Sequence, residues 1–345
     1  MQSKILLSLL CLFCALSCKA QVDQAQPVQF TAVSASLPEL KNNFNIQLGV
    51  YVYNASIEKY KEHPEKLADA IASFGFNTVY LGVSSRRLNV DEPYTSYIRN
   101  LTAALYTKSI KLHCTMFETN IFGEEMDNGV RAYWTYQKGS TVKQRFQGIS
   151  FDIEAHTMTE RNADWKHVAE KYNINTYWKG ENGYGADGPN SKIMKIVLTQ
   201  IKEIKDAIKD KNAVYSEAIG HFYEDHFVTG DFSVGGINDY TKDCDYAIIM
   251  NYTDDAKRLI RQSEMELKNA IKPLSVEIAI KTVDNGVGEL TTSYADEGWD
   301  AMMDGLNKLC LASKPYPSFR GIGIFDFSGL EKMWDEKKTK TKTNP

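Results

Sequence analysis

One pattern recurs along most of the chain: a short apolar run, a polar loop and a segment whose apolar residues recur at helical spacing. The first copy pairs an apolar run at 46–53 with an amphipathic segment at 64–74 that stops at Gly75. Such runs are typical of buried strands, and the helical spacing is typical of helices packed on a core. The pattern predicts strands at 46–53, 77–83, 110–117, 148–154, 213–220, 245–251, 274–280 and 321–327. It predicts helices at 64–74, 95–108, 124–146, 191–209, 255–270 and 296–312.

Eight strands alternating with helices predict a (β/α)8 barrel, an α/β fold, formed by a single domain over residues 44–330. An open, doubly wound sheet is the alternative, but no Gly-x-Gly-x-x-Gly follows the first strand, which weakens its nucleotide-binding version. An insertion rich in Gly, Asn and aromatic residues interrupts the repeat at about 155–190. Outside the barrel we expect a polar linker at 21–43 and a disordered basic tail at 331–345.

Residues 1–20 have the features of an export signal peptide. Lys4 is followed by an apolar run at 5–16, which is too short to span a membrane. Two cleavage sites remain open: an ordinary signal-peptidase site before Gln21, or a site that resembles a bacterial lipoprotein box at 15–18 (ALSC), with Cys18 lipidated. Both predict an exported protein, located in the periplasm, on the cell surface or outside the cell. Only a lipidated Cys18 would attach it to a membrane.

The composition narrows the class of partner. The 345-residue chain carries a formal net charge of −4, which argues against a nucleic-acid partner. Outside the predicted signal peptide only Cys114, Cys244 and Cys310 remain, a set too sparse for a disulfide framework or a zinc site. We expect these cysteines to be small buried apolar residues. Tyrosine is frequent, which is compatible with sugar binding.

The fourth predicted strand ends in two carboxylates. Asp152 and Glu154 are two positions apart, so they point to the same face of the strand, while Phe151 and Ile153 point to the other. Crowding disfavours ionisation of both carboxyls, so one of them tends to hold a proton near neutral pH, as a general acid must. A structural alternative stays open, in which Asp152 caps the next helix and Glu154 is a solvated side chain.

Polar and aromatic residues at the carboxyl ends of the other strands are candidates for the same site, because barrels of this kind carry their active sites at that end. Tyrosines and carboxylates dominate there. The sequence shows no Ser-His-Asp signature, phosphate-binding loop or metal-ligand spacing, so we expect no metal and no organic cofactor. The predicted substrate-binding residues are Tyr51, Tyr53, Glu118, Asn120, Asn251, Asp254 and Phe325, with Trp178 of the insertion as a residue that stacks on a sugar ring.

Three strands resemble the signature strands of glycoside hydrolase family 18, the chitinase and endo-β-N-acetylglucosaminidase family. The segment at 148–154 (GISFDIE) resembles a strand ending in Asp-x-Asp-x-Glu, and 246–252 (YAIIMNY) resembles Met-x-Tyr followed by an acid. The segment at 321–326 (GIGIFD) resembles the Gly-rich last strand. The chain departs from the family where Ser150 replaces the first Asp and where Thr253 directly follows the tyrosine. Phe325 or Phe327 stands near the place where many members have a Trp under the sugar.

The resemblance implies a barrel enzyme that hydrolyses β-linked N-acetylglucosamine glycans with retention of configuration. It implies that Glu154 protonates the glycosidic oxygen and later deprotonates the incoming water. The substrate's own N-acetyl carbonyl attacks the anomeric carbon, so no enzyme nucleophile is required. Asp152 then orients the acetamido N–H and Tyr252 hydrogen-bonds the acetamido carbonyl. Chitin, peptidoglycan and the core of an N-linked glycan remain open as substrates.

Two other functions remain open at this stage. One is a retaining glycosidase with an enzyme nucleophile, in which Glu154 is the acid and Glu277 of the seventh strand is the nucleophile, about 5 Å apart. The other is a catalytically silent barrel that binds glycans, an alternative motivated by Ser150 and Thr253. A pure binder has no need of two crowded carboxylates, which argues against the second alternative.

Overall fold

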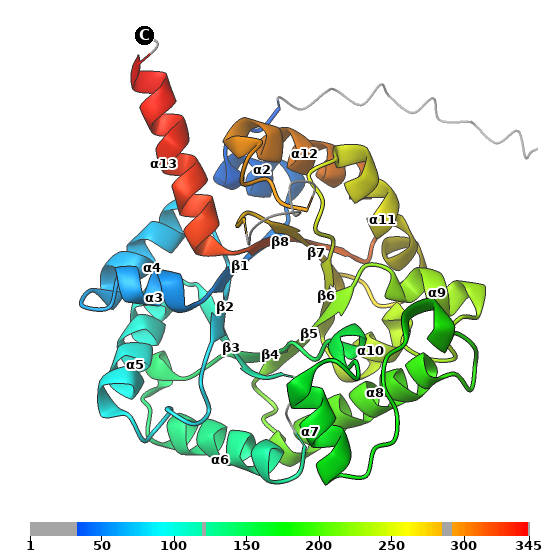
Figure 1. Ribbon diagram of the computed structural model, residues 1–345. Coiled ribbons are helices and arrows are strands. Elements are labelled where there is room, and N and C mark those ends of the chain that lie inside the picture. The colour runs from blue at the N-terminus through cyan, green and yellow to red at the C-terminus, as the bar shows by residue number, and fades with distance from the viewer. Residues whose placement is uncertain (1–32, 119–121, 285–291, 344–345) are drawn as a thin grey trace, which may run out of the picture. The chain divides into compact units, whose positions relative to one another are not determined.

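The eight predicted strands are parallel and close into a barrel, in which each strand pairs with its neighbours in the sequence and β1 pairs with β8 (Figure 1). The computed structural model describes residues 33–118, 122–284 and 292–343. The predicted export signal at 1–20 therefore lies outside the described residues. The strands are β1 (Gln47–Val52), β2 (Thr78–Gly82), β3 (Lys111–Phe117), β4 (Gly148–Phe151), β5 (Val214–Gly220), β6 (Tyr246–Met250), β7 (Val276–Lys281) and β8 (Phe319–Phe325). The (β/α)8 prediction is confirmed.

The helices surround this ring of strands (Figure 1). Long helices follow most strands, as predicted, and shorter ones fill the loops on the way. In chain order they are α2 (Leu37–Phe44), α3 (Asn54–Lys59), α4 (Pro64–Ser73), α5 (Glu92–Thr107), α6 (Glu124–Lys138), α7 (Ala163–Lys171), α8 (Pro189–Ile208), α9 (Tyr223–Thr229), α10 (Ile237–Asp243), α11 (Ala256–Asn269), α12 (Gly298–Ser313) and α13 (Phe327–Thr343). Among the described residues, no helix is both long and apolar enough to cross a membrane.

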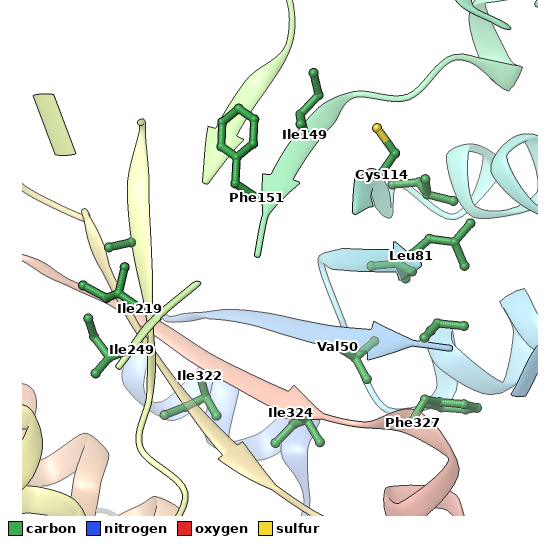
Figure 2. Close-up of a cluster of buried hydrophobic side chains, with 14 of the residues drawn as sticks. Val50, Leu81, Cys114, Ile149, Phe151, Ile219, Ile249, Ile322, Ile324 and Phe327 are labelled. Carbon is green, nitrogen blue, oxygen red and sulfur yellow. The ribbon is translucent and has the colours of Figure 1, made fainter. Parts of the chain in front are cut away.

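Side chains that alternate along the strands divide between two cores. The outward-facing side chains pack against the helices and form the larger core, which Figure 2 shows in part, with Val50, Leu81, Cys114, Ile149, Phe151, Ile219, Ile249, Ile322, Ile324 and Phe327 labelled. The inward-facing residues Tyr51, Tyr80, Tyr246, Ile248 and Ala279 form a second core inside the barrel. Cys114, Cys244 and Cys310 are buried, as expected, and each is a free thiol.

A polar layer fills the barrel beneath its mouth. The Tyr80 hydroxyl donates to the Glu277 Oε1 atom over 2.8 Å, and the Arg320 Nε atom lies 3.4 Å from Oε2. The Arg320 guanidinium stacks 4.0 Å from the centre of the Tyr246 ring. Burial lowers the pKa of His113, in the same layer, to about 3, so the imidazole is neutral there. The side chains of Tyr80, Tyr246, His113 and Glu277 are buried, so this layer occupies the interior of the barrel.

Both predicted boundaries of the barrel domain are wrong. The predicted linker at 21–43 contains most of α2, which is capped by Ser36 and buries Leu37 and Leu40 against the barrel domain. The predicted disordered tail contains most of α13, which buries Leu330 and Met333. In each case a few apolar residues at helical spacing anchor a segment whose polar composition hid them. The described domain accordingly begins near Ser34 and continues to Thr343.

Some helix predictions also need correction. The helix predicted at 124–146 ends at Lys138, and a separate 3-10 turn covers 142–144 after Gly139 and Ser140. The insertion at 155–190 contains α7, whose N-terminus is capped by Asn162. The pattern also did not predict the helices α9 and α10 between β5 and β6, because each is only seven residues long.

Candidate active site

Asp152 and Glu154 lie just beyond β4, at the mouth of the barrel. The strand itself ends at Phe151, but the alternation continues: Phe151 and Ile153 are buried, while Asp152 and Glu154 are half-buried on the opposite side. The two carboxyls therefore share one face, as the sequence predicts. The chain holds this extended form because its backbone still bonds to both neighbouring strands.

Those backbone bonds come from different sources. The Asp152 N–H donates to the Phe117 carbonyl at the end of β3 over 3.1 Å, which continues the ladder on that side. The Ile153 N–H donates to the Glu217 side chain on β5 over 3.1 Å. After Glu154 the chain turns, and the Thr157 N–H and hydroxyl both donate to the Glu154 carbonyl. The peptide that carries the carboxyl pair is thus bonded on both sides.

Burial raises the pKa of each carboxyl at the mouth, and neighbouring charges add to the effect at Asp152 and Glu154. Burial, and then the charges of Glu154 and Glu118, raise the pKa of Asp152 to about 7. Burial and the Glu118 charge raise the pKa of Glu154. The Glu118 side chain is exposed in area, yet the protein around its carboxyl desolvates it and raises its pKa as well. A site of this kind retains protons near neutral pH, which is the state a general acid needs.

Three tyrosines and a phenylalanine lie beside the carboxyl pair. The charge of Asp152 raises the pKa of Tyr51, Tyr53 and Tyr252, after the larger effect of burial on each. The Phe325 ring centre lies 5.6 Å from the ring centres of all three tyrosines. Among the described residues the buried Tyr51 hydroxyl has no hydrogen-bond partner. The site thus combines acids with phenol groups around an apolar ring.

The two departures from the family 18 pattern are both buried. The Ser216 hydroxyl donates to the Ser150 oxygen over 3.1 Å, so a pair of neutral side chains occupies this part of the barrel. Thr253 is also buried, and its hydroxyl accepts from the Asp255 N–H over 3.3 Å at the start of α11. Neither side chain supplies a charge to the site.

The structure places several predicted substrate-binding residues elsewhere. The Asn251 side chain is fully buried and donates to the Leu259 carbonyl and the Ser263 hydroxyl of α11, both over 2.8 Å. Burial, and then the charge of Asp254, raise the pKa of Tyr294 on the loop before α12. Burial also raises the pKa of Glu297, with a smaller contribution from Asp254. Asn251 and Asp254 therefore lie on the helix side or at the neighbouring loop. Asn120 lies outside the described residues.

The aromatic insertion is mainly packed on the protein. The Trp178 ring centre lies 5.4 Å from that of Phe232 and 6.2 Å from that of Tyr223. Trp165 is fully buried against Phe122, with ring centres 5.7 Å apart. Stacking of Trp178 on a sugar is limited to its half-exposed side, and Trp165 has no surface for it.

Glu217 is not among the predicted site residues, yet it lies next to the carboxyl pair and bonds to the Ile153 N–H. It is fully buried, and burial and the charge of Asp152 raise its pKa well above the usual range. A signal was present in the sequence, because Tyr215, Glu217 and Ile219 alternate along β5 and a carboxyl among outward-facing apolar residues is unusual.

A groove with a volume of about 510 Å³ opens beside the site, at the carboxyl ends of β1, β2 and β3. Tyr53 and Glu118 line its inner end, and Arg86 lies 3.4 Å from Glu125 along it. A groove of this size has room for small-molecule or sugar-sized ligands. In the part of the chain that the structure describes, no group of His, Cys, Asp and Glu side chains is arranged to hold a metal ion.

The sequence matches no family model and no curated protein. The structure is similar to the glycoside hydrolase domain of PgaB (BpsB) from Bordetella bronchiseptica, at 9% identity over 85% of this chain and 97% of that chain, with a TM-score of 0.50. A GH18 chitinase from Pseudoalteromonas aurantia matches at 10% identity over 85% of this chain and 99% of that chain, with a TM-score of 0.49. At such identities the likeness concerns the fold alone.

A third solved structure was determined with a sugar bound. It is a plant class V chitinase mutant from Cycas revoluta in complex with (GlcNAc)3, at 10% identity over 84% of this chain and 99% of that chain, with a TM-score of 0.45.

Proposed function

We propose that the chain is a divergent glycoside hydrolase of family 18 type that cleaves glycans containing β-linked N-acetylglucosamine. One observation carries the proposal: Asp152 and Glu154 share a face at the mouth of a (β/α)8 barrel, with raised pKa values and Tyr252 beside them. Two of the three motifs that resemble family 18 supply these residues, and the third supplies Phe325. All three therefore meet at one site.

The reaction that we propose is substrate-assisted hydrolysis with retention. Glu154 gives its proton to the glycosidic oxygen as the bond to the anomeric carbon breaks, and the substrate's N-acetyl oxygen forms a bond to that carbon. Asp152 accepts a hydrogen bond from the acetamido N–H and stabilises the cationic oxazolinium ion. The Tyr252 hydroxyl donates to the acetamido oxygen. Glu154 then takes a proton from water, which opens the ring and leaves the enzyme in its starting state.

The electrostatics of the site support these roles. The raised pKa of Glu154 favours a protonated acid near neutral pH. Asp152 has a pKa of about 7, so it ionises readily when a positive charge develops next to it. Phe325, among three tyrosines, offers an apolar surface on which the face of a sugar can lie. The groove beside Tyr53 extends the site for further sugar units.

The substrate class is part of the proposal. The chitinase from Cycas revoluta was determined with (GlcNAc)3 bound. We propose a GlcNAc-containing glycan for this chain too, because the mechanism requires an N-acetyl group on the sugar that is cleaved. The groove contains both Arg86 and Glu125, so its charge favours no single sign. This charge pattern does not distinguish chitin-type chains from the core of an N-linked glycan, so the test includes one substrate of each kind.

A turnover assay tests the proposal. Wild type and Glu154→Gln are compared on an N-acetylchitooligosaccharide and on a high-mannose glycoprotein. We expect product from wild type on one arm and a fall of about 10² to 10⁴ in kcat for the variant, because the general acid is lost. The control is Glu266→Gln on α11, a fully buried carboxyl outside the site, which should keep its kcat. Full activity of Glu154→Gln would contradict the mechanism.

Two measurements, one of the product and one of inhibition, separate substrate assistance from an enzyme nucleophile. NMR of the product formed first should show retained configuration, and a thiazoline derived from N-acetylglucosamine should inhibit competitively as a mimic of the oxazolinium ion. Inversion, or a covalent glycosyl-enzyme detected by mass spectrometry, would overturn the proposal. Glu277 is a poor candidate for that nucleophile, because Tyr80 and Arg320 bind both of its oxygens within the barrel.

The second candidate is a catalytically silent glycan-binding barrel. The buried Ser150–Ser216 pair motivates it, since a neutral pair stands where the family pattern has a carboxylate. Its signature is measurable binding of N-acetylchitooligosaccharides by calorimetry with no turnover on either arm. Turnover by wild type excludes it.

We further propose that the protein is exported and that residues 1–20 contain the signal. Two forms of the mature protein are possible: one cleaved by an ordinary signal peptidase before Gln21, and a lipoprotein in which Cys18 is lipidated. Cell fractionation of the full chain, with radiolabelled fatty acid in the medium, tests both forms. Label that disappears in Cys18→Ala indicates a lipoprotein, and unlabelled protein in the exported fraction indicates ordinary cleavage before Gln21. Retention in the cytoplasm contradicts export.

A further inference from the structure

Glu217 lies behind the carboxyl pair, on the helix side of β5. Its side chain is fully buried. Its Oε1 atom accepts a hydrogen bond from the Ile153 N–H over 3.1 Å. Ile153 is the residue between Asp152 and Glu154, so this bond reaches the peptide from which both carboxyls project.

The bond replaces a missing part of the sheet. The ladder between β4 and β5 ends with the pair Phe151 and Glu217. On the β3 side the backbone continues one step further, because the Asp152 N–H donates to the Phe117 carbonyl. On the β5 side the next N–H belongs to Ile153, and the Glu217 side chain takes the place of a backbone carbonyl. Without this acceptor a buried N–H would lose its partner.

The surroundings of Glu217 favour its neutral form. No ion pair to it is present among the described residues, and its Oε2 atom has no hydrogen-bond partner there. A buried carboxylate with no countercharge is unfavourable, so the carboxyl retains its proton. The titratable groups that interact with it electrostatically are the carboxyls of Asp152 and Glu154, the Tyr223 and Tyr240 phenols and the Cys244 thiol.

A second side chain secures the segment further along. The Tyr223 hydroxyl, from the start of α9, accepts from the His156 N–H over 3.2 Å and lies 2.9 Å from the His156 Nδ1 atom. Residues 153 and 156 are therefore both bound by side chains that come from β5 or directly follow it. The backbone that carries Glu154 is bonded on each side of that residue.

We propose that Glu217, as a neutral carboxylic acid, is a positioning residue for the reaction: it holds the peptide between Asp152 and Glu154 so that both carboxyls face the barrel mouth. This inference rests on the proposed hydrolase activity. Glu217 touches no substrate in this role. It acts on the geometry of the two catalytic carboxyls, to which small displacements matter because proton transfer requires close alignment.

Two substitutions separate the parts of this proposal. Glu217→Gln keeps an oxygen for the Ile153 N–H and, like a protonated Glu, carries no charge. Glu217→Met keeps the length and apolar stem of the side chain but removes the acceptor. Glu266→Met on α11 is the control, because Glu266 is also fully buried but neither of its oxygens has a hydrogen-bond partner among the described residues, so the substitution removes a buried carboxyl without removing such a bond.

We expect Glu217→Gln to keep the kcat of wild type and the pH profile of kcat/KM. We expect Glu217→Met to lose about 100-fold in kcat, the size of effect that a displacement of about 1 Å can cause. KM should change little, because the substrate contacts remain. Glu266→Met should keep kcat whatever it does to stability. The proposal is overturned if Glu217→Gln loses as much kcat as Glu217→Met, or if Glu217→Met loses none.

The pH profile of Glu217→Gln tests whether the Glu217 carboxyl is neutral in the wild type. If Glu217 is ionised in the wild type, its removal in Glu217→Gln lowers the pKa of Glu154 and moves the alkaline limb of the pH profile to lower pH. That shift would overturn the neutral form. The Gln variant gives this answer even if the Met variant fails to fold.

A measurement without substrate distinguishes failure of this inference from failure of the proposed function. Amide hydrogen exchange followed by NMR should show the Ile153 N–H strongly protected in wild type and Glu217→Gln. In Glu217→Met that amide should exchange quickly. Fast exchange of the same amide in wild type would mean that Glu217 does not protect it. If wild type cleaves no glycan, protection in wild type and Gln with loss in Met still supports Glu217 as the anchor of this peptide, and equal exchange in all three overturns it.

Discussion

Inside the barrel, the Ser216 hydroxyl donates a hydrogen bond to the Ser150 oxygen over 3.1 Å. Ser150 is two residues before Asp152 in the chain. Both serines are fully buried. The pair leaves Asp152 with no acidic neighbour on β4 below it, and its charged neighbours are Glu154 and Glu118 at the mouth. The charges that add to the effect of burial on the pKa of Asp152 therefore come from the mouth of the barrel.

Replacement of Ser150 by Asp should destabilise the fold in a pH-dependent way. The new carboxyl is buried without a cation, so its pKa in the folded protein is higher than in the unfolded chain, where it is about 3.9. The free energy of unfolding should then fall as pH rises above that value, with a loss of about 2 to 4 kcal/mol at pH 8 and much less at pH 5. Urea unfolding at the two pH values measures this. Ser150→Asn is the neutral control, and equal losses at both pH values would contradict the explanation.

Asp152→Asn should make the protein more stable at alkaline pH. The pKa of Asp152 is about 7 in the folded state, above its unfolded value of about 3.9. A raised carboxyl pKa favours the folded protein only while the group is protonated, so that contribution is lost as pH rises from about 4 through 7. The variant has no such loss. We expect it to exceed wild type by a few kcal/mol at most at pH 8 and to match it near pH 4. A variant less stable than wild type at pH 8 would contradict this.

Tyr252→Phe should lower kcat by about 10²-fold and change KM less, because the lost hydroxyl holds the acetamido oxygen in the orientation from which it attacks the anomeric carbon. The Phe325 ring can still pack on the new ring, since it lies 5.6 Å from the present one. The control is Tyr294→Phe, which removes a buried hydroxyl on the loop before α12. An equal loss in both variants would indicate a general packing effect.

Glu277 and Arg320 should behave as a structural pair. Glu277→Leu leaves the Arg320 guanidinium in the barrel without its carboxylate, which should cost about 3 to 5 kcal/mol of unfolding free energy. The double variant Glu277→Leu with Arg320→Met should recover most of that loss. Glu277→Gln, which can still accept from Tyr80, should keep its kcat. A collapse of kcat in Glu277→Gln would restore the enzyme-nucleophile mechanism.

The periodicity of the sequence determined the barrel and its central pair of acids. Apolar runs of strand length and amphipathic helices depend on local spacing, which a sequence shows directly. The same rule of alternate faces placed Asp152 and Glu154 together, and the structure agrees. The rule of alternate faces also applies to Asn251. This residue is adjacent to Tyr252, so its side chain points the other way, into α11.

Only the tertiary structure decided what depends on distant contacts. Trp178 packs on aromatic residues more than forty positions away, and the polar segments of α2 and α13 fold because they find apolar surfaces on the barrel domain. Glu217 and Ile153 are 64 residues apart, and their bond arises where the ladder between β4 and β5 ends. Spacing along one strand shows which face a side chain takes, whereas the partner on that face depends on how strands and helices come together in space.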